Sequence, residues 1–221
     1  PRVNRPTEGD IKAAIINELI EGYKIQKNTT IISEFFMNDR RKRLDLAIVD
    51  DKIWGFEIKT ARDDLGRLLP QIATYLRFCE GVTVVVDSYH LSKVRQILPK
   101  NVGLWSVECL AHDASVNVIR KTPFRNLTKK DDILKLVRVA DLQQLLKENN
   151  RKTFSNKRRH LIQQARRQYS TELRSFAIKK LKEKYSVSSD DFWNAIEGKS
   201  AKRGDIIRLS LYSAINEQYK N

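Results

Sequence analysis

Residues 43–60 read RLDLAIVDDKIWGFEIKT and place Asp45, Glu57 and Lys59 in sequence that is otherwise apolar and β-branched. The acidic pair in the middle divides the stretch into two short segments, which predicts two consecutive antiparallel strands. Because side chains alternate along a strand, Glu57 and Lys59 share one face of the second strand. Their neighbours on both faces are mainly apolar, so the burial of these charges needs an explanation.

The length of the connection decides whether the charges meet. Residues directly opposite each other in a hairpin lie on the same side, so Asp45 faces Glu57 only if paired residue numbers sum to 102. That register requires a three-residue connection, Asp50 to Lys52, and brings the two Cβ atoms to about 5 Å. A two-residue turn would place Asp45 on the wrong face. Gly55 is expected to leave the same face open for the close approach of another backbone.

Two neighbouring carboxylates repel each other unless a cation compensates them. Lys59 offsets part of the repulsion, and a divalent ion offsets more. Mg²⁺ prefers sites built from one or two carboxylates, waters and substrate phosphate oxygens. Such an ion would polarise a scissile phosphate and activate a bound water, which the lysine would orient or deprotonate. The alternative is a buried ion cluster of Asp45, Glu57 and Lys59 without catalysis.

Further polar residues surround this expected site. Gln71 and Tyr75 are four positions apart on an expected helix, so they are adjacent on one face and could orient a water, a phosphate or the lysine. An ordinary half-exposed helix face is the alternative. Ahead of the first strand, the run NDRRKR carries Arg41, Lys42 and Arg43. Contact with phosphate and simple solvation are both open for these three residues.

The surrounding sequence predicts an α/β layer architecture with a mixed central sheet. Helices are expected at 8–22, within 64–79 and at 91–98, and further strands at 30–37, 82–87 and 102–108, with an edge strand at 116–124. The order is therefore helix, three antiparallel strands, helix, strand, helix, strand. Pro70 restricts how the second helix begins, because a proline fits only the first turn or a kink.

From about residue 127 the composition changes. We expect a domain at 1–126, a connecting amphipathic helix at 127–150 and a basic all-helical domain at 151–221. This last segment contains 17 Lys or Arg against 7 Asp or Glu, which gives ten of the fifteen net positive charges of the chain. It would hold a nucleic acid across the site, or serve docking or dimerisation.

Apolar spacing predicts three helices within the basic segment. An apolar stripe that includes Tyr169 runs through one long helix, and Ser188 or Ser189 is expected to cap a second. The last helix, at 204–219, is apolar around much of its circumference. A homodimer or a protein partner is therefore an alternative use for that helix.

The net charge of +15 and the isoelectric point near 9.9 indicate a polyanionic partner. Nucleic acid is the usual cause, with an anionic membrane surface second. The basic helices lack a bulky apolar face beside the basic one, which disfavours the membrane. Four arginines of the C-terminal segment are candidate phosphate ligands: Arg158, Arg159, Arg166 and Arg167.

Cysteine usage and hydropathy exclude other classes of protein. Cys79 and Cys109 form no CxxC pair, so both thiols are expected in the core rather than in a zinc site or a disulfide. Apolar runs fall far short of the roughly 20 residues that a bilayer crossing needs. The first ten residues lack the apolar core of a signal peptide, and we expect a cytoplasmic protein.

The motif of Asp45, eleven residues and then Glu57-Ile58-Lys59 resembles the signature of the PD-(D/E)XK nuclease superfamily. The expected αβββαβ order is the restriction-endonuclease-like core of that superfamily. The stretch QIATY at 71–75 resembles the QxxxY motif of its RecB-like exonuclease branch. The stretches IWGFEIKTARDDLGRLLPQIATYLRF, VTVVV and KRRHLIQQ are similar to a small family of bacterial and phage PD-(D/E)XK-like proteins with a basic helical C-terminus. The likeness extends from the first helix to about residue 185.

The resemblance implies a set of catalytic residues: Asp45, Glu57, Lys59, Gln71 and Tyr75. Of these, Asp45 and Glu57 would be metal ligands and Lys59 the catalytic lysine. A further acidic ligand on the first helix is expected at Asp10, or at Glu8 close by; the superfamily usually has Glu there.

The implied activity is hydrolysis of phosphodiester bonds with Mg²⁺, or with Mn²⁺ as a substitute, in DNA rather than RNA. Two alternatives stay open. One is a non-catalytic nucleic-acid-binding or regulatory module on a nuclease fold, and the other is a nuclease subunit directed by a protein partner.

Overall fold

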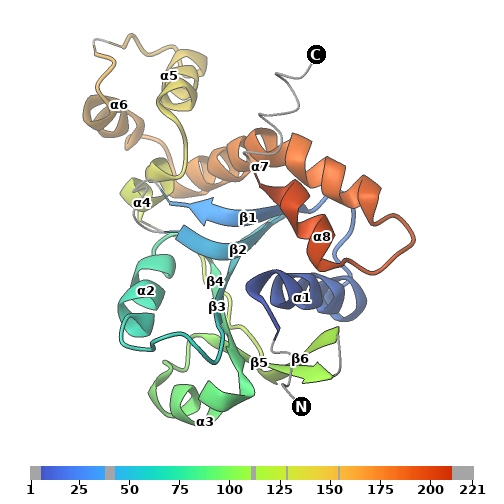
Figure 1. The fold of residues 1–221 in the computed structure, drawn as a ribbon. Coiled ribbons are helices and arrows are strands. Elements are labelled where there is room, and N and C mark those ends of the chain that lie inside the picture. Colours follow the sequence, from blue (N-terminus) through green and yellow to red (C-terminus); the bar gives the residue numbers. More distant parts are fainter. Residues whose placement is uncertain (1–5, 38–42, 111–112, 128, 154, 211–221) are drawn as a thin grey trace.

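The computed structural model describes residues 6–37, 43–110, 113–127, 129–153 and 155–210 (Figure 1). Its centre is a six-stranded mixed sheet in the order β1-β2-β3-β4-β5-β6. The strands are β1 (Thr30–Phe36), β2 (Arg43–Val49), β3 (Ile53–Lys59), β4 (Gly81–Asp87), β5 (Gly103–Leu110) and β6 (Asp113–Arg120). The helices are α1 (Glu8–Tyr23), α2 (Leu68–Tyr75), α3 (Ser88–Ile97), α4 (Lys130–Lys135), α5 (Val139–Glu148), α6 (Arg158–Ala165), α7 (Ser170–Ala195) and α8 (Arg203–Ile206), followed by the 3-10 helix η1 (Ile207–Leu209).

The predicted α/β class and the order of the first eight elements are confirmed. β1, β2 and β3 pair antiparallel, β3, β4 and β5 pair parallel, and β6 adds an antiparallel edge. Pro70 is the third residue of α2 and so lies in its first turn, where its missing N–H costs no helical hydrogen bond.

The turn between β2 and β3 has the length that the charged residues require. Leu46 pairs with Phe56, so paired residue numbers sum to 102 as predicted. Across the turn Asp50–Lys52, the first backbone N–H donates to the last carbonyl at 3.0 Å. The β2–β3 pairing ends at Leu46 and Phe56. The two strands therefore separate just where Asp45 would come opposite Glu57.

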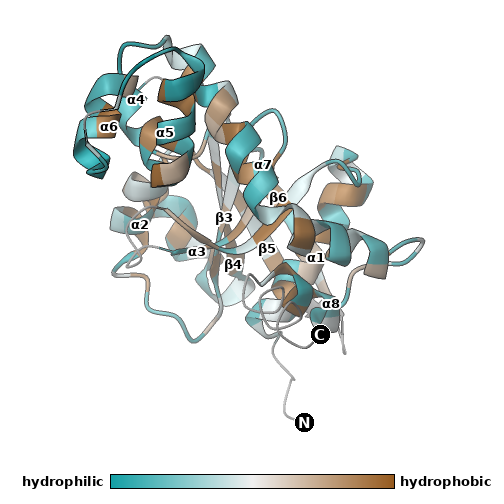
Figure 2. Cartoon of the chain, turned by 90° about the horizontal axis from the view of Figure 1, so that it is seen from above, coloured by the Kyte–Doolittle hydropathy of each residue, from teal (hydrophilic) through white to brown (hydrophobic). Residues whose placement is uncertain are grey.

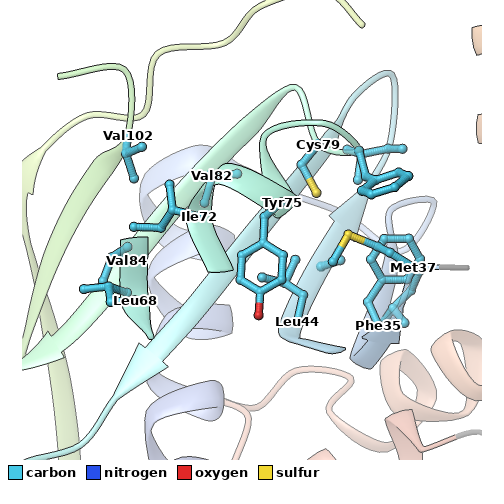
Figure 3. Close-up of a cluster of buried hydrophobic side chains, with 14 of the residues drawn as sticks. Phe35, Met37, Leu44, Leu68, Ile72, Tyr75, Cys79, Val82, Val84 and Val102 are labelled. Carbon is cyan, nitrogen blue, oxygen red and sulfur yellow. The ribbon is translucent and has the colours of Figure 1, made fainter. Parts of the chain in front are cut away.

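Helices cover both faces of the sheet (Figure 1). α1, α8 and the C-terminal end of α7 pack on one face, while α2, α3 and the middle of α7 pack on the other. The central strands are mainly brown in Figure 2, whereas the surrounding helices carry hydrophilic residues as well. Figure 3 shows the core on the α2 and α3 face, where the ring of Tyr75 lies beside Leu44 and the side chain of Leu68 lies beside Val84. The sheet is thus a buried scaffold, typical of parallel and mixed α/β layers.

α7 does not end at the serines. The prediction that Ser188 or Ser189 caps a new helix is wrong, because both lie inside the 26 residues of α7 and are buried. The Ser189 hydroxyl accepts the backbone N–H of Ile31 at 3.1 Å and donates to the carbonyl of Thr29 at 3.4 Å. The Ser188 hydroxyl donates to the carbonyl of Tyr185 within α7 at 3.2 Å, so neither serine caps a helix N-terminus.

The predicted connecting helix is two helices. α4 ends at Lys135 and α5 begins at Val139, because the Asp141 carboxylate accepts the backbone N–H of Arg138 at 2.8 Å. An acceptor at this position starts a new helix by satisfying one of its free N–H groups.

The predicted long basic helix is also interrupted, between α6 and α7. The break lets Leu161 of α6 and Leu173 of α7 enter one small core with α4 and α5. Tyr169, which the apolar stripe placed in a core, caps α7 and is 76% exposed.

The basic segment 151–221 packs in two places. α6 and the first turns of α7 belong to the small core with α4 and α5, which stands apart from the sheet in Figure 1. The rest of α7 and α8 belong to the two cores of the sheet. Residues 211–221, with most of the predicted last helix and its dimer or partner surface, lie outside the described residues. A separate domain at 151–221 stays a prediction.

Membrane-crossing helices are not found among the described residues: none of their helices combines the necessary length and apolarity.

Gly55 provides space for packing rather than access for a ligand. A Cβ at this position would lie 2.4 Å from Leu44 Cδ2 and 3.1 Å from Cys79 Sγ. Both neighbours are fully buried, so the core fills the space over the glycine. The expectation that Gly55 leaves the face open is therefore wrong. Cys79 is a buried free thiol, as predicted, and the side chain of Cys109 lies outside the description.

Replacing Gly55 with alanine should lower the free energy of unfolding by about 1–3 kcal/mol, because the new methyl group overpacks a closed core. Urea unfolding measures this change. Gly204→Ala is the control, since nothing lies within 4 Å of a Cβ at that position. Leu44→Ala should cost less stability in the Gly55→Ala protein than in the wild type. An unchanged urea midpoint for Gly55→Ala would contradict this account of the core.

Candidate active site

A pocket of about 530 Å³ lies where β2 begins and β3 ends. Its charged and polar lining includes Glu8, Asp45, Glu57, Lys59, Gln71 and Tyr75. The structure therefore brings together the five residues predicted for catalysis, from β2, β3 and α2, with one acidic residue of α1.

The side chain of Asp45 acts as the hydrogen-bond acceptor for a backbone N–H of β3 at the point where β2 and β3 separate. Its Oδ2 accepts the backbone N–H of Ile58 at 2.6 Å. Burial, and then the nearby charge of Glu57, raise the pKa of Asp45 well above its usual range, although the Ile58 hydrogen bond acts in the opposite direction. Burial and repulsion prevail, so a cation close to this carboxylate would stabilise its charged form.

Glu57 is 2% exposed, and only one of its two carboxylate oxygens has hydrogen-bond partners among the described residues. Its Oε1 accepts from Lys59 Nζ at 2.6 Å and from Gln71 Nε2 at 2.7 Å, whereas its Oε2 has no hydrogen-bond partner among the described residues. Burial raises the pKa of Glu57, and the adjacent Lys59 only partly opposes this effect. A buried acceptor without a donor is costly, and a bound cation would remove that cost.

Gln71 and Tyr75 hold this arrangement from α2. Gln71 Nε2 lies 3.3 Å from the Tyr75 hydroxyl, which donates to the carbonyl of Arg43 at 3.0 Å. Burial of the phenol and the charge of Glu57 raise the pKa of Tyr75. The two residues are adjacent on one helix face, as predicted, and they link Glu57 to the start of β2.

The α1 residue at the pocket is Glu8 rather than Asp10. Asp10 Oδ2 accepts the backbone N–H of Thr7 at 2.8 Å and its hydroxyl at 2.5 Å, which makes Asp10 part of the capping box of α1. Carboxylate oxygens of Glu8, Glu34 and Asp45 lie within 4.8 Å of one another. The first choice of Asp10 as the metal ligand is thus corrected, because capping engages its carboxylate, and Glu8 is the residue in position.

Glu34 is a residue of the site that the sequence prediction missed. It lies opposite Asp45 in the antiparallel pairing of β1 and β2, with φ 61° in the left-handed region. Its carboxylate forms ion pairs with Lys12 and Arg43. The available signal was a single charged residue in the apolar strand TIISEFF, although its position depends on the unusual backbone conformation.

The predicted basic cluster ahead of β2 is described only in part. Arg41 and Lys42 lie outside the described residues. Arg43 is exposed, lines the pocket and pairs with Glu34.

The four C-terminal arginines divide by environment. Arg158 donates from Nη2 to the carbonyls at the end of α4, at 2.7 to 3.2 Å, which makes it a cap of that helix. Arg159 and Arg167 are exposed, and Arg166 is exposed beside its ion-pair partner Asp131. Arg158 therefore has a structural contact at the end of α4, whereas its role as a phosphate ligand stays a prediction.

Comparison with known proteins gives a family. The family model described as bacteriophage P4 protein cII matches residues 1–210. Protein cII of enterobacteria phage P4 is 30% identical over 195 residues, which cover 86% of this chain and 72% of that protein. The chain therefore belongs to the bacteriophage P4 cII family. A solved protein of unknown function from Silicibacter pomeroyi has 20% sequence identity and a TM-score of 0.42. The superposition covers 67% of this chain and 97% of the other chain.

Replacing Asp45 with asparagine should stabilise the metal-free protein at neutral pH. Because the pKa of Asp45 is raised on folding, its contribution to stability is present below the unfolded pKa of about 3.9 and is lost as the pH rises through the folded pKa. Asparagine keeps an acceptor for Ile58 without the charge. We expect a free energy of unfolding in EDTA at pH 7 that is higher by more than about 0.5 kcal/mol, the usual limit for surface changes.

The stabilisation should shrink toward pH 4, where Asp45 of the wild type is protonated in the folded state. Asp10→Asn makes the same chemical change in the capping box and should give no stabilisation at either pH. Equal stability of the Asp45→Asn protein and the wild type at pH 7 would mean that the protein itself already compensates this charge.

Proposed function

We propose that this member of the phage P4 cII family is a divalent-metal-dependent nuclease that hydrolyses phosphodiester bonds, DNA before RNA. One observation carries the proposal: Asp45, Glu57 and Lys59 converge in one pocket, and a buried oxygen of Glu57 has no partner among the described residues. The order α1, β1, β2, β3, α2, β4 supports assignment to the PD-(D/E)XK superfamily and its restriction-endonuclease-like fold.

The pocket fits a hard divalent cation. Oxygen donors predominate in its lining, which includes neither His nor Cys among the described residues. Carboxylates combined with waters and phosphate oxygens suit Mg²⁺, and Mn²⁺ accepts the same donors. Asp45 and Glu57 would hold the ion, because both carboxylates line the pocket and Oε2 of Glu57 has no hydrogen-bond partner among the described residues. The bound ion would supply polarisation of the phosphate and a lower pKa of a coordinated water.

Lys59 is positioned for the phosphate rather than for solvent. Its side chain is 10% exposed and its Nζ lies 2.6 Å from Glu57 Oε1, so the ammonium is held beside that carboxylate in the pocket lining. From there it would stabilise negative charge that develops on the phosphoryl oxygens, or orient the attacking water. Gln71 would act indirectly, through Glu57, because its amide donates to the same oxygen of Glu57 that Lys59 binds.

Basic groups at and beyond the pocket suit a polyanionic substrate. Arg43 and Arg67 line the mouth of the pocket. Arg159 and Arg167 are exposed on the unit formed by α4, α5 and α6 with the start of α7, near the exposed ring of Tyr169. Affinity from such contacts is not specific for sequence and falls steeply with salt. A phosphate backbone could therefore extend from the pocket toward this unit.

Glu57→Gln and Lys59→Met should each reduce cleavage at least about 100-fold, because each removes charge that acts on the reacting phosphate. The assay uses circular and linear DNA and RNA with Mg²⁺ or Mn²⁺ at low salt, and binding is measured in parallel. Glu21→Gln, on the exposed face of α1, is the matched control and should cleave like the wild type.

Wild-type protein that leaves every substrate uncut would contradict the nuclease proposal. Salt-dependent binding without any metal dependence would then favour a nucleic-acid-binding module on a nuclease fold. Loss of cleavage and of folding together in both variants would instead favour a structural ion cluster.

Arg159→Ala with Arg167→Ala should weaken DNA binding without loss of stability. If both side chains contact phosphates, the slope of log K against log salt should fall by about 1.8. Arg158→Ala should instead lower the thermal midpoint, because the carbonyls of Leu134, Lys135 and Val137 at the end of α4 lose a donor. Unchanged DNA affinity in the double variant would favour docking of a protein partner on this unit.

A further inference from the structure

Lys12 fills a position between two carboxylates on the α1 side of the pocket. Its Nζ lies 2.7 Å from Glu8 Oε1, 2.5 Å from Glu34 Oε1 and 3.1 Å from the hydroxyl of Ser33. These contacts use all three donors of an ammonium group. Because the residue is only 4% exposed, the chain itself provides a buried and fully coordinated cation at this position.

Glu34 is held for this contact at a cost in backbone energy. With φ at 61° its backbone is left-handed, which is unfavourable for a residue other than glycine and persists only where surrounding contacts enforce it. Lys12 binds one oxygen of Glu34 and Arg43 binds the other. Both oxygens of Glu34 are therefore held in ion pairs, whereas Oε2 of Glu57 is in none. Oε2 of Glu34 resembles Oε2 of Glu57 only in accepting no hydrogen bond among the described residues.

The charge balance of the pocket also indicates that it accommodates a single divalent ion. Four carboxylates face three cationic groups around the expected ion position: the carboxylates of Glu8, Glu34, Asp45 and Glu57, and the cations of Lys12, Arg43 and Lys59. Asp63 and Arg67, which also line the pocket, add one charge of each sign and leave the balance unchanged. One divalent ion would make this set weakly positive, which suits a phosphate anion. A second ion would have to enter beside a buried ammonium and would be repelled by it.

We propose that the Lys12 ammonium is a built-in second cation, so that the pocket takes one divalent ion, between Asp45 and Glu57, although its four carboxylates have the charge to hold two. The inference rests on the proposed function only in taking Asp45 and Glu57 as the metal-binding pair. Lys12 is a positioning residue, because it acts through Glu8 and Glu34.

Counting bound Mn²⁺ tests the proposal without substrate. Titration followed by the electron paramagnetic resonance signal of free Mn²⁺, with calorimetry alongside, should give one ion per wild-type chain. Lys12→Met removes the cation and should give two ions per chain, whereas Lys12→Arg keeps the charge and should give one. Two ions in the wild type, or one ion in folded Lys12→Met protein, would overturn the proposal.

A second pair of variants decides the question even if Lys12→Met does not fold. Glu34→Gln should keep the Mn²⁺ dissociation constant within about threefold of the wild type, because Glu34 is not a ligand. Glu57→Gln should raise that constant at least tenfold, and the exposed control Glu21→Gln should leave it unchanged. A tenfold or greater loss of affinity in Glu34→Gln would make the acidic cluster of Glu8, Glu34 and Asp45 the metal site, which overturns the proposal.

The two proposals fail in different ways. One bound Mn²⁺ per chain without cleavage of any nucleic acid would sink the nuclease proposal and support the role of Lys12. Cleavage with two bound ions would do the reverse. Absence of Mn²⁺ binding in the wild type would overturn both.

Discussion

The separation of β2 from β3 beyond the pair of Leu46 and Phe56 is the constraint on which the pocket depends. Past this pair the backbone N–H of Ile58 donates to a side chain, the carboxylate of Asp45. The same separation leaves Glu57 buried with one unsatisfied oxygen among the described residues. Stability is thus lost locally in the free protein, at the place where binding of a cation to the folded state would restore it.

The register of the hairpin could be predicted because it depends on local alternation. An odd connection places Asp45 and Glu57 on the same side, and this rule needs no knowledge of the rest of the chain. The α1 residue could not be chosen by counting, because Asp10 is also a good capping residue and the helix start uses it. Glu34 was not predicted because its position depends on one backbone angle. Lys12 was not predicted because it lies among apolar residues of α1, and its partners Ser33 and Glu34 come from β1.

The C-terminal helices show the limits of periodicity more plainly. Their apolar spacing identified helical sequence between residues 130 and 195 but not where each helix begins and ends, because tertiary contacts decide that. Asp141 divides one predicted helix, while Ser189 continues another by bonding the edge of β1. The same applies to charge: Arg158 and Arg159 are equivalent in sequence, yet one caps α4 and the other is exposed. A basic run therefore indicates a partner class better than it identifies the contacting residues.

The turn between β2 and β3 is also held from outside. Lys182 of α7 pairs with Asp50 at 2.9 Å, and Arg174 of α7 contacts the carbonyl of Asp51 and the buried carboxylate of Glu80. Loss of one residue from this turn would shift the hairpin register and also break these contacts with α7. Within the family, insertions and deletions should therefore be excluded from this turn although it is exposed, and an alignment of relatives can use it as a fixed point.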